Sequence, residues 1–174
     1  MKKVRVPLST AGIELLEKEL QEYRKWQEAK AKELAERLAT LGASVASIRF
    51  ARATYTGIKD TTITVEQIAN GYAVKADGES VLFLEFGSGI TYGGGHPENS
   101  EFGMGPGTYP TDTKMRTATD GNRYKNWENP DGWWIPKSAG GGHTYGNPPA
   151  MAMYEARKTI IRELPRIVKE VFSG

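Results

Sequence analysis

The chain has two histidines, and each of them follows three consecutive glycines, at residues 93–95 before His96 and at residues 140–142 before His143. If the intervening segment folds back on itself, the two imidazoles could meet at a metal ion. Two histidines without carboxylates at a matching spacing make a weak ligand set, and the absence of cysteine excludes thiolate zinc sites. We therefore expect no metal and no other cofactor. The alternative role for the two histidines is to hydrogen-bond backbone groups within turns.

Carboxylates in the same region could in principle supply an acid–base pair for hydrolysis, and nearby aromatic residues would suit a sugar-binding cleft. These carboxylates are Glu98, Glu101, Asp112, Asp120, Glu128 and Asp131. Acids scattered along a loop are usually only solvated. Residues 87–89 lack the spacing of a nucleophile elbow, and residues 103–107 lack the lysine of a phosphate loop. The sequence therefore predicts no catalytic residue, and we expect that the protein is not an enzyme.

A small basic cluster surrounds Tyr124 and consists of Lys114, Arg116, Arg123 and Lys125. Such a cluster can meet phosphates or an acidic partner protein through charge, or it can simply keep a loop soluble. The formal net charge of the chain is only +2, from 23 basic and 21 acidic residues. Dedicated duplex-binding domains carry a clearer basic excess, so any contact with DNA is expected to be local and non-specific.

All of these residues belong to a Gly-, Pro- and Trp-rich stretch that we interpret as an insertion at about residues 90–147. Loops of this length are usually functional or disordered, and tryptophans are rare in purely disordered segments. The sequence therefore predicts an interface formed by aromatic anchors. The candidate anchors are Phe102, Tyr109, Tyr124, Trp127, Trp133 and Trp134. Residues 132–136 could also form a short strand within the insertion.

Two amphipathic helices flank the remaining sequence. The first is expected to begin at a Ser9 or Thr10 cap and to run to about Leu41, because apolar residues recur at three- and four-residue spacing and Gly42 is a natural stop. The second follows Pro148 and Pro149, with a proline in its first turn and a kink or restart at Pro165. Residues 43–57 are ambiguous between a short helix and an irregular strand.

Between the helices, residues 61–68 alternate polar and apolar side chains, and residues 72–76 follow a turn at Asn70 and Gly71. The apolar run 81–86 is interpreted as a third strand, buried on both faces. The predicted fold class is α+β: one domain over residues 1–174, in which a small antiparallel sheet carries both helices and the loop insertion. The chain start lacks the apolar core of a signal peptide, and no segment is apolar enough to span a bilayer.

Four residues stand out at the ends of these elements. Glu85 ends an apolar run, where its charge needs an arginine or backbone amides as partners, and we interpret it as part of a structural ion pair. Gly87 and Gly89 would let the chain leave the run sharply. Tyr154, with its neighbour Met153, opens the last helix and is expected to pack against the end of the run.

Two segments carry a resemblance to a known family. Residues 81–89, VLFLEFGSG, resemble a strand end of the head–tail joining proteins of long-tailed bacteriophages, variously called neck, tail-completion or minor-tail-protein-Z-like proteins. Residues 143–156, HTYGNPPAMAMYEA, are similar to the proline-rich turn before the C-terminal helix of that family. The long helix before a hairpin is similar too, whereas many members have a shorter insertion.

The resemblance implies a structural virion protein made in the host bacterial cytoplasm, a compartment that the lack of cysteine fits. It implies a sixfold or twelvefold homo-oligomeric ring between the head-side connector and the tail-end proteins, around the DNA channel and away from any membrane. Neck, tail-completion and tail-terminator positions all stay open. The alternative from another class is a virion-associated cell-wall hydrolase or carbohydrate-binding module.

Overall fold

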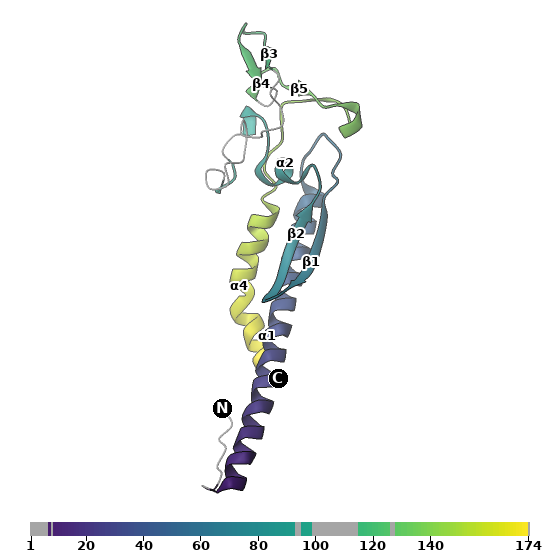
Figure 1. Ribbon diagram of the computed structural model, residues 1–174. Coiled ribbons are helices and arrows are strands. Elements are labelled where there is room, and N and C mark those ends of the chain that lie inside the picture. Colours follow the sequence, from purple (N-terminus) through teal and green to yellow (C-terminus); the bar gives the residue numbers. More distant parts are fainter. Residues whose placement is uncertain (1–6, 8, 93–94, 99–114, 126–127, 174) are drawn as a thin grey trace.

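The computed structural model describes residue 7 and residues 9–92, 95–98, 115–125 and 128–173. The fold is α+β, as predicted, and it is elongated: two long helices lie side by side, a hairpin lies along the first of them, and small ribbons gather at one end (Figure 1). The helices are α1 (Thr10–Arg52), α2 (Val81–Phe86) and α4 (Ala152–Phe172), and two short 3-10 turns cover Ile90–Tyr92 and Lys137–Ala139. The strands are β1 (Thr62–Ile68), β2 (Gly71–Asp77), β3 (Met115–Thr117), β4 (Arg123–Lys125), β5 (Trp133–Trp134) and β6 (His143–Thr144).

Helix α1 begins as predicted and ends later than predicted. The Ser9 side chain accepts a hydrogen bond from the amide of Gly12 at 3.2 Å, which caps the helix. Gly42 does not stop it, because the helix continues to Arg52 and absorbs most of the ambiguous segment 43–57. Gly42 is buried where α4 crosses, and a Cβ there would lie 2.7 Å from Cδ1 of Ile160. The glycine thus serves close helix packing and not termination.

Helix α4 packs along α1, and small side chains set their approach. The buried core is a compact cluster, Ala46, Phe50, Leu84, Ala152 and Ala156, to which both helices and α2 contribute. The prolines lie before α4 and not in its first turn, since Met151 is the N-cap residue. Pro165 lies inside the helix, which continues through it to Phe172 instead of restarting.

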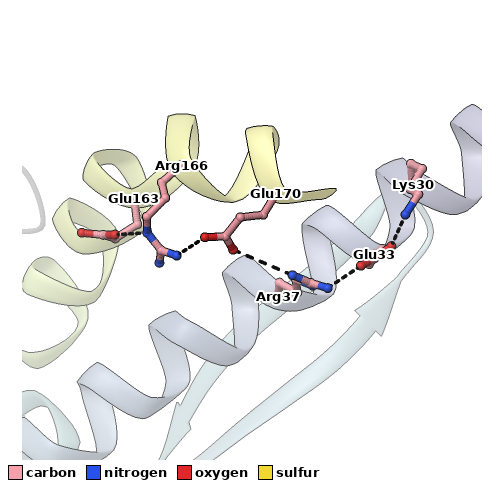
Figure 2. Close-up of polar contacts among 6 residues, drawn as sticks. All are labelled: Lys30, Glu33, Arg37, Glu163, Arg166 and Glu170. Carbon is pink, nitrogen blue, oxygen red and sulfur yellow. Dashed lines mark hydrogen bonds and ion pairs between the residues drawn. The ribbon is translucent and has the colours of Figure 1, made fainter. Parts of the chain in front are cut away.

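Further along, the two long helices are joined by a ladder of ion pairs (Figure 2). On α1, Glu33 pairs with Lys30 and Arg37; Arg37 reaches Glu170 of α4 at 4.0 Å, and Arg166 links Glu170 to Glu163. The hydrogen bond from Lys30 is the largest cause of a lowered pKa at the half-buried Glu33. Surface pairs of this kind each contribute little to stability, and of these pairs only Arg37 with Glu170 joins the two helices.

The strands form three separate antiparallel ribbons, β1–β2, β3–β4 and β5–β6, where one sheet was predicted. In the first ribbon Ile68 pairs with Gly71, so the loop residues are Ala69 and Asn70, one position earlier than expected. Positive φ occurs at Gly71 and not at Asn70. The short strand expected within residues 132–136 is present as β5.

The predicted third strand, residues 81–86, is wrong: this run is helix α2. A short apolar run has no periodicity that separates a buried strand from a buried helix. The structure resolves the ambiguity at the preceding residues, where the Asp60 carboxylate accepts hydrogen bonds from the amides of Glu79 and Ser80 at the start of the helix. Without a third strand there is no common sheet, and the helices pack on each other instead. Within the described part of the chain, no helix combines the length and apolar character needed to cross a membrane.

Candidate functional site

The two segments that carry the family resemblance meet in the structure. Ser88, just after α2, and Asn147, before α4, form an isolated antiparallel bridge in which each amide donates to the other residue's carbonyl oxygen at 3.0 Å. The amide of Ala150 donates to the carbonyl of Leu84 at 2.7 Å, and the Asn147 side chain donates to the carbonyl of Phe83 at 2.8 Å. We call this contact, residues 83–89 with 147–154, the junction.

Two glycines make the junction possible. Gly87 and Gly89 have φ values of +79° and +80°, in the region that favours glycine. A Cβ at Gly87 would lie 2.9 Å from the carbonyl oxygen of Asn147, and one at Gly89 would overlap the carbonyl of Tyr145. These glycines were expected to let the chain leave a strand, and they follow helix α2 instead. The close approach of a second segment of chain explains why both positions exclude a side chain.

Glu85 lies at the centre of the junction and is buried, with 5% of its surface exposed. Its carboxylate accepts hydrogen bonds from the amides of Met153 at 2.9 Å and Tyr154 at 3.0 Å, in the first turn of α4. A negative charge at a helix N-terminus is stabilised by the free amides and by the helix dipole. Of the two partners predicted for Glu85, backbone amides are the ones found.

His96 closes the junction from the insertion. The amide of Glu98 donates to its Nδ1 at 3.1 Å, so Nε2 carries the proton and faces Glu85 Oε1 at 3.3 Å. The ring packs against Phe86 at 4.4 Å and edge-on to Tyr154 at 5.5 Å between centroids. His96 is 3% exposed, so this part of the insertion belongs to the core.

His143 lies in β6 and has different neighbours. Its ring packs edge-on between Trp134 at 5.3 Å and Tyr145 at 5.0 Å. The two histidines therefore contact different residues and share no partner, and the described residues contain no group of three or more side chains suited to hold a metal.

The aromatic anchors predicted from sequence are distributed unevenly. Trp134 is 70% exposed and Tyr145 is 56% exposed, and with His143 they form a row that we call the aromatic row. Trp133 and Tyr124 are half-buried. Three further candidates, Phe102, Tyr109 and Trp127, lie outside the described residues.

The basic cluster is divided by the β3–β4 ribbon. Thr117 pairs with Arg123 and Arg116 pairs with Tyr124. Since side chains alternate across a strand, Arg123 and Lys125 lie on one face and Arg116 lies on the other face with Tyr124. Lys114 is outside the described residues. The three described members, Arg116, Arg123 and Lys125, therefore do not form one basic patch.

The carboxylates of the insertion are engaged in local structure. Asp131 accepts hydrogen bonds from the amide and hydroxyl of Thr119. Asp120 accepts from the amide of Asn122 and the hydroxyl of Tyr124, which together hold the pKa of this exposed carboxyl below its usual value. Glu98 pairs with Arg157 of α4. Glu128 is half-buried, and Glu101 and Asp112 lie outside the described residues.

Sequence reasoning did not single out Ser88 and Asn147, or the contact between Glu85 and His96. The available signal was a polar residue next to glycine at each end of the insertion: Ser88 lies between two glycines, and Asn147 follows Gly146. Comparison of the chain with protein-family models, with curated proteins and with solved structures found no match.

Proposed function

We propose that this protein is a structural component of a long-tailed bacteriophage virion, in which copies form a ring that joins the head connector to the tail around the DNA channel. The observation that supports the proposal is the junction. The two segments that resemble the head–tail joining family are 59 positions apart at Ser88 and Asn147, and yet they form one hydrogen-bonded unit. A resemblance confined to two unrelated surface loops would carry less weight.

The distribution of apolar side chains also fits a protein whose work is binding. Among the described residues the buried core is one compact cluster, whereas large apolar side chains are exposed along both helices and the insertion. Exposed apolar groups in such number are typical of surfaces that become covered in an assembly. In this proposal α1, α4 and the junction form the rigid body, and the ribbons of the insertion contact neighbouring virion proteins.

Disruption of the gene in the phage that encodes it tests the proposal. We expect lysates to contain separate filled heads and complete tails, and an antibody raised against the purified protein to label the head–tail boundary of normal particles. Intact, infectious particles in the absence of the protein would contradict the proposal.

The aromatic row favours a second candidate, a carbohydrate-binding module of the virion. Trp134 and Tyr145 are exposed on either side of His143, and exposed aromatic faces are a common surface for sugar rings. Sedimentation of the protein with purified cell-wall material distinguishes the two. Binding that is lost in Trp134→Ala would support the module, and an absence of binding supports the neck protein.

A further inference from the structure

The N-terminal part of α1 has no covering element in the described structure. Figure 1 shows it extending beyond the end of α4 and beyond the β1–β2 hairpin. The last contact with α4 in this direction is between Trp26 and Phe172, whose rings lie edge-on at 5.9 Å. From residue 13 to residue 29 no side chain is buried.

We call residues 13–33 the projecting segment: its N-terminal turns project, and its last turns, from Trp26 on, lie beside Phe172 and the β1–β2 turn. The segment is not a purely polar helix. Ile13, Leu20 and Tyr23 are each more than half exposed, and with Leu16 they follow the three- and four-residue spacing of a single stripe. An isolated helix of this length is marginally stable in water, because most helical stability in proteins comes from packing of the apolar face. The exposed stripe therefore indicates that this part of α1 packs against a partner.

The charges of the projecting segment are segregated along its length. Residues 14–22 contain four glutamates and one lysine, whereas residues 24–32 contain four basic residues and one glutamate. Internal pairs, such as Arg24 with Glu28 and Lys30 with Glu33, neutralise only part of this pattern. Tyr23 lies at the boundary between the acidic half and the basic half.

We propose that two copies of this chain pair through the projecting segment as antiparallel helices, with Tyr23 close to the two-fold axis. An antiparallel arrangement places the acidic half of each copy beside the basic half of the other, whereas a parallel arrangement would place like charges together. The same surface serves both copies, as a two-fold interface requires.

The apolar side chains fit this register. Leu20 and Trp26 are each three residues from Tyr23, so each copy's leucine lies at the level of the other copy's tryptophan. The paired segment of 21 residues spans about 30 Å. The inference goes beyond the proposed function: it concerns two copies of the free protein, and the contact has to open before the copies enter a ring whose subunits are related by rotation about a single axis.

Sedimentation equilibrium of the purified full chain tests the proposal. We expect a reversible shift from the 19.2 kDa monomer to twice that mass between about 1 and 100 µM. The variant Glu17→Lys with Glu22→Lys, and the variant Lys25→Glu with Lys32→Glu, should each weaken association by about tenfold or more, because each sets like charges together. Combining all four changes reverses both halves and should recover association.

A matched control and an orientation test complete the experiment. Glu66→Lys with Glu79→Lys changes the net charge as the first variant does, but at exposed positions outside the segment, and should leave association unchanged. Because the chain has no cysteine, Tyr23→Cys gives a single thiol that should form a disulfide-linked dimer on mild oxidation, whereas Ile13→Cys should not. A monomer at every concentration, association insensitive to both charge variants, or efficient linkage through Ile13→Cys would each overturn the proposal.

Discussion

Ser88 and Asn147 hold each other's main chain across 59 positions of sequence, since the amide of each donates to the carbonyl oxygen of the other at 3.0 Å. The bridge joins the two ends of the insertion directly to each other. The parts of the insertion that do not contact the junction can therefore vary in length and shape while α2 and the start of α4 stay in register.

Replacing Asn147 with alanine should destabilise the protein. The side chain is 2% exposed, donates to the carbonyl of Phe83 and accepts from the hydroxyl of Ser88, so its removal leaves buried groups without partners. We expect a loss of about 1–3 kcal/mol in the free energy of unfolding, measured by urea denaturation. Asn122→Ala, in an exposed turn, is the control and should change little. Equal stability of the two variants would argue against the bridge.

Glu85→Gln should also lower stability, because the carboxylate accepts two charge-assisted hydrogen bonds at the N-terminus of α4. We expect a loss of about 1.5–3 kcal/mol in the same measurement. Glu155→Gln is the matched control: it lies in the first turn of the same helix but pairs with Arg49 and Lys158 at the surface, where a loss below about 1 kcal/mol is expected. A larger loss of unfolding free energy in Glu155→Gln than in Glu85→Gln would contradict the role of Glu85 at the N-terminus of α4.

Gly42 tests the packing of α1 on α4. Gly42→Leu should cost about 1–3 kcal/mol, because its side chain would enter the space held by Ile160. Gly42→Ala should be nearly neutral, since the end of a flexible side chain can move and alanine favours the helix by about 1 kcal/mol. Ile160→Ala combined with Gly42→Leu should recover part of the loss. Additive losses in a double-mutant cycle would show that the two positions do not contact each other.

The lowered pKa of Asp60 predicts that the stability of the fold depends on pH. Hydrogen bonds from the Ser80 hydroxyl, the Ser80 amide and the Glu79 amide lower the pKa of its carboxyl to about 2. A carboxyl with a lowered pKa stabilises the fold above its unfolded pKa of about 4, and this contribution is lost as the pH falls through about 2. The melting temperature of Asp60→Asn should therefore be lower than that of the wild type at pH 6 and should approach it near pH 2. A difference in melting temperature that stays the same from pH 6 to pH 2 would contradict the stabilising role of the Asp60 carboxylate.

Substitution of Trp134 tests whether the aromatic row serves assembly without contributing to stability. Its side chain is 70% exposed, so Trp134→Ala should leave the melting temperature within about 2 °C of the wild type, as for most surface changes. If the aromatic row contacts other virion proteins, the variant should fail to complement a disrupted gene. Val65→Ala, at a residue 38% exposed on the β1–β2 hairpin, is the control and should complement normally. Full complementation by Trp134→Ala would place the contact elsewhere.

Local signals predicted several elements correctly. The Ser9 cap, the alternation in β1 and the apolar stripe of α4 are each expressed within a few residues of chain, so short-range patterns suffice to find them. The fold class followed from their order.

Long-range packing decided the elements that sequence patterns missed. Gly42 has the sequence signature of a helix stop, but Ile160 of α4 lies against it inside the helix. Residues 81–86 have the pattern of a strand, but the Asp60 carboxylate binds the amides of Glu79 and Ser80 just before them, and the run is a helix. In the same way, the partners of Glu85 come from α4 and the insertion. Each of these contacts joins residues that are far apart in the sequence, so patterns within a few residues could not predict it.

The contact between Gly42 and Ile160 also joins two helices that are made at different times during synthesis. α1 is complete once Arg52 has been made, but its partner α4 ends 120 residues later, at Phe172. At about 5–20 residues per second, translation leaves α1 without α4 for on the order of ten seconds. The part of α1 that packs against α4 is uncovered for this whole interval, which is long compared with helix formation itself. Nascent chains on neighbouring ribosomes would then expose the same helix at the same time, so encounters between copies can precede the completion of either fold.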